Sequence, residues 1–153
     1  MPDVECGFRD HEGIPARDLL VTYGPTLQVD IGFDPDYDSS QPQRLPLSAL
    51  RQVRALIDTG ATISCIDRTL AAKLALPVVD RQNFGGIGGL YLTEMHSAQS
   101  HVPTLNFTVH GLFAGVDLLG GGQQHVALIG RTFLQSMRMI YEGPTGRVIL
   151  GLP

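Results

Sequence analysis

The sequence has no tryptophan, only two cysteines and no long run of apolar residues. A membrane-spanning helix needs about 18 or more consecutive apolar residues, so no membrane association is expected. The formal net charge is −4, from 11 basic and 15 acidic residues, and the basic residues form no cluster. A nucleic-acid-binding surface would need such a cluster. The composition therefore argues against both membranes and nucleic acids as partners.

The cysteine and histidine patterns argue against the common disulfide and metal sites. Cys6 and Cys65 are too few for a disulfide framework or a zinc site, and Cys65 has the apolar neighbours of a small core residue. No Gly-x-Ser-x-Gly elbow presents a serine nucleophile. The histidines show neither the His-Glu-x-x-His pattern nor helical ligand spacing, and they stand at positions 11, 96, 101, 110 and 125. We therefore expect no metal and no cofactor.

The length and composition are those of one globular domain. The 153 residues are 43% hydrophobic and 17% charged, which is enough to bury a core. Residues 1–20 are predicted to form an acidic, irregular arm, and residues 21–153 a single domain with an inserted loop at about 33–47, rich in Pro and Asp. The acidic start is unlike a signal peptide, so a cytoplasmic location is the default expectation.

Short apolar segments separated by turn residues predict a fold built mostly of strands. The 18 glycines and ten prolines favour tight turns between short elements. Residues 27–31 alternate apolar and polar side chains, as in a half-buried strand, and residues 138–141 and 147–150 flank a turn, as in a hairpin. Further strands are predicted at about 53–57, 64–66, 90–95, 102–109 and 126–129.

Two short helices are predicted among these strands. Asp67 is expected to cap a helix over residues 68–75, which are rich in helix formers and are followed by Pro77 as a stop signal. The second helix is predicted over residues 131–137. Together the elements predict an all-β fold, with short strands in a closed or sandwich-like arrangement.

The central motif is Asp-Thr-Gly-Ala at residues 58–61, which directly follows three apolar residues. A buried lone carboxylate is costly unless it is paired, hydrogen-bonded or protonated. An acid at the end of an apolar strand therefore points to a function for Asp58. The three letters Asp-Thr-Gly alone are a weak signal, because they often mark a turn, and they occur once in the chain.

Two further segments accompany this motif. Residues 85–89 carry glycine at four of five positions, which suits the tip of a hairpin and lacks the residues of a phosphate-binding loop. Residues 128–130, Leu-Ile-Gly, follow Asp58 by about 70 residues. With these three parts in this order, the sequence resembles the retropepsin-like aspartic proteases over about residues 27–150, and a cellular member more than a viral one.

The resemblance implies a small closed β-barrel of the retropepsin type and a known mechanism. Family members carry one Asp-Thr-Gly per chain and build the active site from two chains, so it implies a C2 homodimer that hydrolyses peptide or protein substrates without a cofactor. Asp58 of each chain would form a catalytic dyad. Two carboxylates at roughly 3 Å cannot both ionise, so they would share one proton and act as base and acid.

The resemblance also implies roles for neighbouring residues. Support of the active-site loop, including a bond across the dimer from the threonine, would come from Thr59, Gly60 and Ala61. The tip that closes over a bound peptide would consist of Gly86, Ile87 and Gly88. The strand beneath the active-site loop would consist of Leu128, Ile129 and Gly130. Candidates for apolar substrate subsites are Ile87, Leu90 and Val126.

Two departures from the family pattern leave alternatives open. Many viral members have an acid after Asp-Thr-Gly-Ala that pairs with the arginine after the late glycine, whereas this chain has Thr62 there and leaves Arg131 without that acidic partner. The arm and the 33–47 insertion also have no counterpart in the viral core. A catalytically silent module of retropepsin fold that binds peptides or acts as a scaffold, and an unrelated small β-barrel with a chance Asp-Thr-Gly, are the alternatives.

Overall fold

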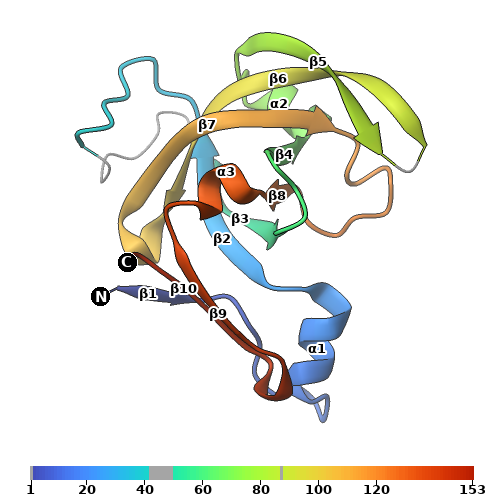
Figure 1. Ribbon diagram of the computed structural model, residues 1–153, viewed down its shortest axis with the longest axis vertical. Coiled ribbons are helices and arrows are strands. Elements are labelled where there is room, and N and C mark those ends of the chain that lie inside the picture. The colour runs from blue at the N-terminus through green and yellow to red at the C-terminus, as the bar shows by residue number, and fades with distance from the viewer. Residues whose placement is uncertain (1, 42–49, 87) are drawn as a thin grey trace.

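Six strands of the described chain close into a barrel. The computed structural model describes residues 2–41, 50–86 and 88–153. Around the barrel the strands run β2 (Thr26–Gly32), β3 (Leu50–Ile57), β8 (Ala127–Ile129), β4 (Ser64–Asp67), β7 (Phe107–Val116) and β6 (Gly89–Val102). The last part of β6 then pairs back onto β2 and closes the ring, and its first part pairs with β5 (Val78–Gly86) along the same edge (Figure 1). The predicted closed all-β fold is confirmed.

A smaller sheet joins the two ends of the described chain. Its three strands are in the order β1 (Asp3–Glu5), β10 (Arg147–Gly151) and β9 (Arg138–Glu142), all antiparallel. The short 3-10 turn η2 (Gly143–Thr145) connects β9 to β10. This terminal sheet extends from the barrel and lies beside a helix, α1 (Ala16–Tyr23) (Figure 1). A second 3-10 turn, η1 (Pro103–Leu105), joins β6 to β7.

The prediction of an irregular arm over residues 1–20 is wrong, because this segment forms β1 and most of α1. The many acids of this segment make it look polar, but Cys6 (1% exposed) and Leu20 (2% exposed) are core residues. Helix α1 is a third helix beyond the two predicted. Its first backbone amide, at Ala16, donates to the carboxylate of Asp10 at 2.8 Å, a cap that stands too far back in sequence for the usual local signal.

The two predicted helices are present but shorter than expected. They are α2 (Arg68–Lys73) and α3 (Arg131–Leu134). Asp67 does not cap α2 with its side chain; instead its Oδ1 accepts the backbone amides of Leu118 and Leu119 at 3.1 and 3.2 Å. The predicted strands correspond to β2, β3, β4, β6, β7, β8, β9 and β10, with shifted bounds. Of the predicted insertion, residues 42–47 lie outside the described residues.

The main hydrophobic cluster lies inside the barrel and continues into the terminal sheet. Leu27, Val29 and Ile31 of β2 pack within it, on the side of the strand that the alternation predicts. Val148 and Leu150 of β10 belong to the same cluster. The terminal sheet is therefore part of the same core and not an appendage.

His101 and His125 are buried at the edges of this core. The Nδ1 atom of His101, on β6, lies 2.8 Å from Oγ1 of Thr108. His125, just before β8, has Nε2 at 2.8 Å from Oγ1 of Thr26 and Nδ1 at 3.0 Å from Oε1 of Gln123. Both rings are thus fixed by hydrogen bonds in places with little room for solvent.

We expect the fold to lose stability in mild acid because of these histidines. Burial lowers the pKa of both His101 and His125, so below the ordinary histidine range near pH 6.5 the unfolded chain binds protons that the folded chain resists. The stabilisation is complete above that pH and is lost as pH falls through the lowered pKa values. Thermal unfolding should show a lower Tm at pH 5 than at pH 7.5. The fall should be smaller for His125→Gln and unchanged for His11→Gln, an exposed control; an equal fall in all three proteins would contradict the assignment to His125.

Candidate active site

Asp58 stands at the end of β3, where the chain leaves the barrel in a tight loop. Strands β3 and β8 run parallel with Ile57 opposite Ile129, and the amide of Asp58 donates to the carbonyl of Ile129 at 2.9 Å. The half-buried carboxylate accepts the amide of Gly60 on Oδ1 at 3.0 Å. Within the described residues its Oδ2 has no hydrogen-bond partner from the protein. One oxygen therefore fixes the side chain and the other is left for a different molecule.

Gly60 and Gly130 allow the backbone to pass close to this carboxylate. A Cβ at Gly60 would lie 3.1 Å from Oδ1 of Asp58. A Cβ at Gly130 would lie 2.7 and 2.8 Å from the carbonyl carbon and oxygen of Ile63 and 2.9 Å from the amide nitrogen of Ser64, which is closer than real Cβ contacts allow. A side chain at Gly130 would therefore force the backbone to move, whereas one at Gly60 would be tight against the carboxylate; neither glycine has a positive φ.

Backbone hydrogen bonds join the Asp58 loop to the start of α3. The amide of Arg131 donates to the carbonyl of Ala61 at 2.9 Å, and the amide of Thr132 donates to the carbonyl of Thr62 at 3.1 Å. The buried hydroxyl of Ser64 accepts the amide of Gly130 at 3.0 Å. Segments about 70 residues apart in sequence are therefore held as one unit.

The side chain of Arg131 adds two hydrogen bonds to this loop. Its Nη1 donates to the carbonyl of Thr59 at 2.8 Å and its Nη2 donates to Oγ1 of Thr62 at 2.9 Å. No carboxylate lies within ion-pair distance of this guanidinium in the described ranges. The sequence leaves Arg131 without the acid that follows Asp-Thr-Gly-Ala in many viral members, and within the described residues two neutral oxygens hold its guanidinium.

A small apolar cluster lies beside the Asp58 loop. Cys65 of β4 packs in it with Met95 and Ala114, and Phe84 and Leu128 are among its partly buried members. Burial, and to a lesser extent the charge of Asp58, raises the pKa of the Cys65 thiol to about 11. The thiol is thus protonated at neutral pH and acts as the core residue that the sequence predicted.

The glycine-rich segment forms the turn of the β5–β6 hairpin. Gly86 pairs with Gly89 at its end, and Tyr91 donates its hydroxyl to the carbonyl of Gly88 at 3.1 Å. Ile87, which the sequence placed at this tip, lies outside the described residues. Phe84, two residues before Gly86 on β5, is a partly buried member of the apolar cluster beside Asp58. Among the described residues no hydrogen bond links the tip to the Asp58 loop.

The two remaining subsite candidates, Leu90 and Val126, lie in different surroundings. Leu90 is 74% exposed and pairs opposite Gly85, one position from the Phe84–Tyr91 pair. Because side chains alternate along a strand, it points to the opposite face from Phe84. Val126 packs against the main core.

Comparison with known proteins was decisive for the family. The family model described as aspartyl protease matches residues 50–133, more than half of the chain, and spans the Asp58 loop, the hairpin and Gly130. The chain belongs to the aspartyl protease family. A solved structure of a retropepsin-like aspartic protease from Rickettsia conorii is similar over 98% of this chain and 91% of that one, with 12% identity and a TM-score of 0.51. The two proteins therefore share a fold.

A second similar structure is the EIAV protease complexed with the inhibitor HBY-793. It has 21% identity, covers 72% of this chain and 85% of that one, and has a TM-score of 0.42. No curated protein sequence matches this chain.

Sequence reasoning missed three contributors to the site of this aspartyl protease. They are the Ser64 hydroxyl, the contacts of Arg131 with Thr59 and Thr62, and Phe84 of the β5–β6 hairpin. For Ser64 a faint signal exists, because a polar residue begins an otherwise apolar strand. The Arg131 contacts join residues about 70 positions apart, so no local sequence pattern predicts them.

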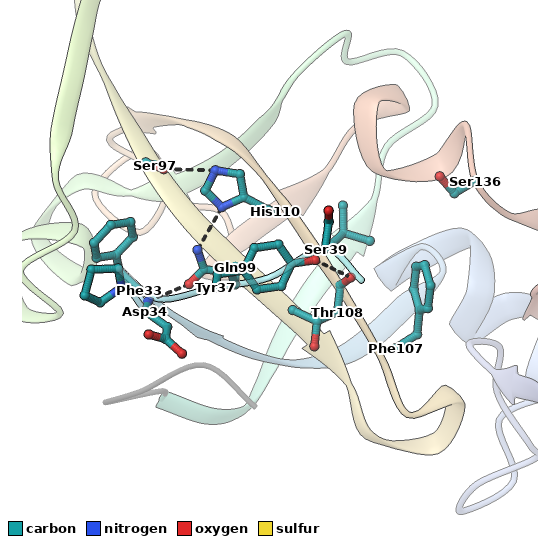
Figure 2. A pocket seen from close by; sticks show the side chains of 12 residues that line it. Phe33, Asp34, Tyr37, Ser39, Ser97, Gln99, Phe107, Thr108, His110 and Ser136 are labelled. Atoms are coloured by element: carbon teal, nitrogen blue, oxygen red, sulfur yellow. Dashed lines mark hydrogen bonds between the residues drawn. The ribbon is translucent and has the colours of Figure 1, made fainter. Parts of the chain in front are cut away.

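A cavity of about 750 Å³ lies away from the Asp58 loop, between residues 33–39 and strands β6 and β7. Figure 2 shows a connected network in its wall: the amide of Asp34 donates to Oε1 of Gln99 at 2.6 Å, and Nε2 of Gln99 lies 2.8 Å from Nδ1 of His110. The His110 ring stacks on Tyr37 with centroids 5.4 Å apart and lies 3.4 Å from the Ser97 hydroxyl. These groups bond one another, so the network holds the chain that follows β2 against the barrel.

No other class of site emerges in the described part of this aspartyl protease. Its described residues contain no cluster of three or more His, Cys, Asp or Glu able to hold a metal ion. None of its helices in those ranges is both long and apolar enough to span a membrane.

Proposed function

We propose that this aspartyl protease is an endopeptidase that works as a homodimer, with Asp58 of each chain forming the catalytic dyad. The observation that carries the proposal is the setting of Asp58. One carboxylate oxygen is tied to Gly60, the other has no protein partner in the described ranges, and the loop is held by backbone hydrogen bonds to β8 and α3. Since the chain has one Asp-Thr-Gly, a two-carboxylate mechanism requires a second copy.

The chemistry follows from two carboxylates that share one proton. The ionised Asp58 takes a proton from a water molecule, whose oxygen attacks the carbonyl carbon of the substrate peptide. The protonated Asp58 of the other chain donates its proton to the carbonyl oxygen. The Asp58 that took the proton from water then donates it to the leaving nitrogen, and the C–N bond breaks. The other Asp58 takes a proton from a hydroxyl of the tetrahedral species as the carbonyl re-forms, so the dyad again holds one proton.

The surrounding residues would supply position and shielding. Thr59 exposes its side chain beside Asp58, where it could reach the second chain, and Gly60 and Ala61 complete the loop. Gly86, Ile87 and Gly88 would close over the bound peptide and exclude water. The supporting strand would consist of Leu128, Ile129 and Gly130.

The terminal sheet offers a surface for the second copy. Strand β9 is an edge strand of that sheet, and its Ile140 and Tyr141 are 42% and 52% exposed. Exposed apolar edge strands readily pair with another chain. A largely apolar cavity of about 350 Å³ lies between this sheet and the Asp58 loop, and Thr59, Met137 and Met139 are among its lining residues. A partner seated there would lie next to the loop that needs a second carboxylate.

Concentration dependence tests the dimer and the activity together. Peptide cleavage at mildly acidic pH should show a specific activity that rises with protein concentration, in parallel with the dimer fraction from sedimentation equilibrium. Dilution below the dissociation constant should remove activity. A specific activity that stays constant while sedimentation shows a monomer would contradict the shared dyad. Peptide binding without cleavage would favour the silent module.

A further inference from the structure

The guanidinium of Arg131 bridges the two ends of the turn that follows Asp58. It holds the carbonyl of Thr59 on one side and the hydroxyl of Thr62 on the other, while its backbone amide holds the carbonyl of Ala61. A single residue of α3 is thus hydrogen-bonded to three residues around Gly60, namely Thr59, Ala61 and Thr62. Because Asp58 is hydrogen-bonded within the same turn, the position of its carboxylate depends on the hydrogen bonds from Arg131.

We propose that Thr62 is a positioning residue for the reaction at Asp58, and this proposal rests on the proposed function. Its hydroxyl holds Nη2 of Arg131, which keeps Nη1 on the carbonyl of Thr59. The planar guanidinium makes the two contacts interdependent, because its donors are fixed relative to each other. Without the Thr62 acceptor the guanidinium is free to rotate away from Thr59 into solvent.

The Arg131 guanidinium donates to acceptors that do not ionise, the carbonyl of Thr59 and the hydroxyl of Thr62. In the described ranges no acid lies within 4.0 Å of the guanidinium, so its partners there are neutral oxygens. The ionisable groups of the loop are Asp58 and Arg131 themselves. The cavity wall on the other side of Arg131 carries no ionisable group, being formed by Leu134, Gln135, Met137, Met139 and Leu150.

This neutrality suits a dyad that shares one proton. A carboxylate in place of Thr62 would change its own charge in the acidic range, so its contact with Arg131 would change with pH. A hydroxyl and a carbonyl accept hydrogen bonds equally at pH 4 and pH 7. The two hydrogen bonds from the Arg131 guanidinium to the loop are therefore the same at both pH values.

Substitutions at Thr62 test the role directly. Thr62→Val keeps the shape and removes the acceptor, whereas Thr62→Ser keeps the acceptor and removes the methyl group. We expect Thr62→Val to lower kcat about 5- to 10-fold with KM within about 2-fold, by the same factor at pH 4 and pH 7. We expect Thr62→Ser to restore kcat to within about 2-fold of wild type. Both variants should keep the Tm and the dimer dissociation constant of wild type, because Thr62 is exposed.

Amide hydrogen exchange at Gly60 and Ala61 gives a readout that does not need activity. Exchange should be faster in Thr62→Val than in Thr62→Ser or wild type. Equal kcat and equal exchange in the two variants would overturn the proposal, and so would a loss of kcat in Thr62→Val that tracks a loss of Tm. If wild type cleaves no peptide but exchange still separates Val from Ser, the positioning role stands and the proposed function fails.

Discussion

Asp58→Asn should remove peptidase activity while the protein still folds and dimerises. Asparagine has nearly the shape of aspartate, and its Oδ1 can still accept the amide of Gly60, which lies 3.0 Å from the carboxylate in the wild type. It cannot act as the base for water or exchange the shared proton. We expect kcat/KM to fall by at least about 10³-fold, in the range seen when a catalytic group is removed, with Tm nearly unchanged.

A matched acid shows whether the effect belongs to Asp58. Asp80 is exposed on β5, and Asp80→Asn removes the same charge away from the loop, so its activity should equal wild type. Mixed dimers sharpen the test further. Wild-type chains mixed with an excess of Asp58→Asn chains should lose activity, because one carboxylate cannot be both base and acid. Retained activity in those dimers would show that a single Asp58 suffices.

Gly130→Ala should be the most destabilising single methyl group in the candidate site. The added Cβ would lie 2.7–2.9 Å from backbone atoms of Ile63 and Ser64. Backbone atoms cannot rotate aside as a side chain can, so β4 and β8 would have to separate. The hydrogen bonds from Gly130 to Ser64 and from Asp58 to Ile129 would weaken with them.

We expect Gly130→Ala to lower the free energy of unfolding by about 2–4 kcal/mol, which corresponds to a fall in Tm of roughly 5–15 °C. Urea denaturation measures the first and calorimetry the second. Gly111→Ala is the control, because a Cβ there meets no atom within 4 Å, and its free energy should stay within about 0.5 kcal/mol of wild type. If both substitutions lower the free energy of unfolding by the same amount, the tight contact at Gly130 does not contribute to stability as proposed.

The barrel strands could be predicted because their signals are local. The alternation along β2 and the unbroken apolar run of β8 are each visible within one short stretch of sequence. A glycine also marks the C-terminal end of each of these strands, Gly32 for β2 and Gly130 for β8. The motif order also predicted that Asp58 and Gly130 would meet. The parallel pairing of β3 with β8 brings them together. Periodicity identifies each strand but does not tell which distant strand it pairs with.

The features that were missed depend on contacts between distant segments. Asp67 has the residue type and position of a helix cap, but two amides of the loop after β7 take its carboxylate instead. The N-terminal segment looked like a polar arm because its acids outnumber the few apolar residues that become buried. Cys6 and Leu20 enter the core only because β10 gives them a surface to pack on.

The terminal sheet has a consequence for the order of events during synthesis. Asp3 pairs with Gly151, so β1 cannot complete its pairing until β10, almost 150 residues later in the sequence, has been made. Contacts of such long sequence separation form slowly, because a long loop must be closed first. The barrel can assemble while β1 is still unpaired, and the sheet that exposes β9 is completed afterwards. Association through the completed sheet would then wait until β10 has been synthesised and has paired with β1.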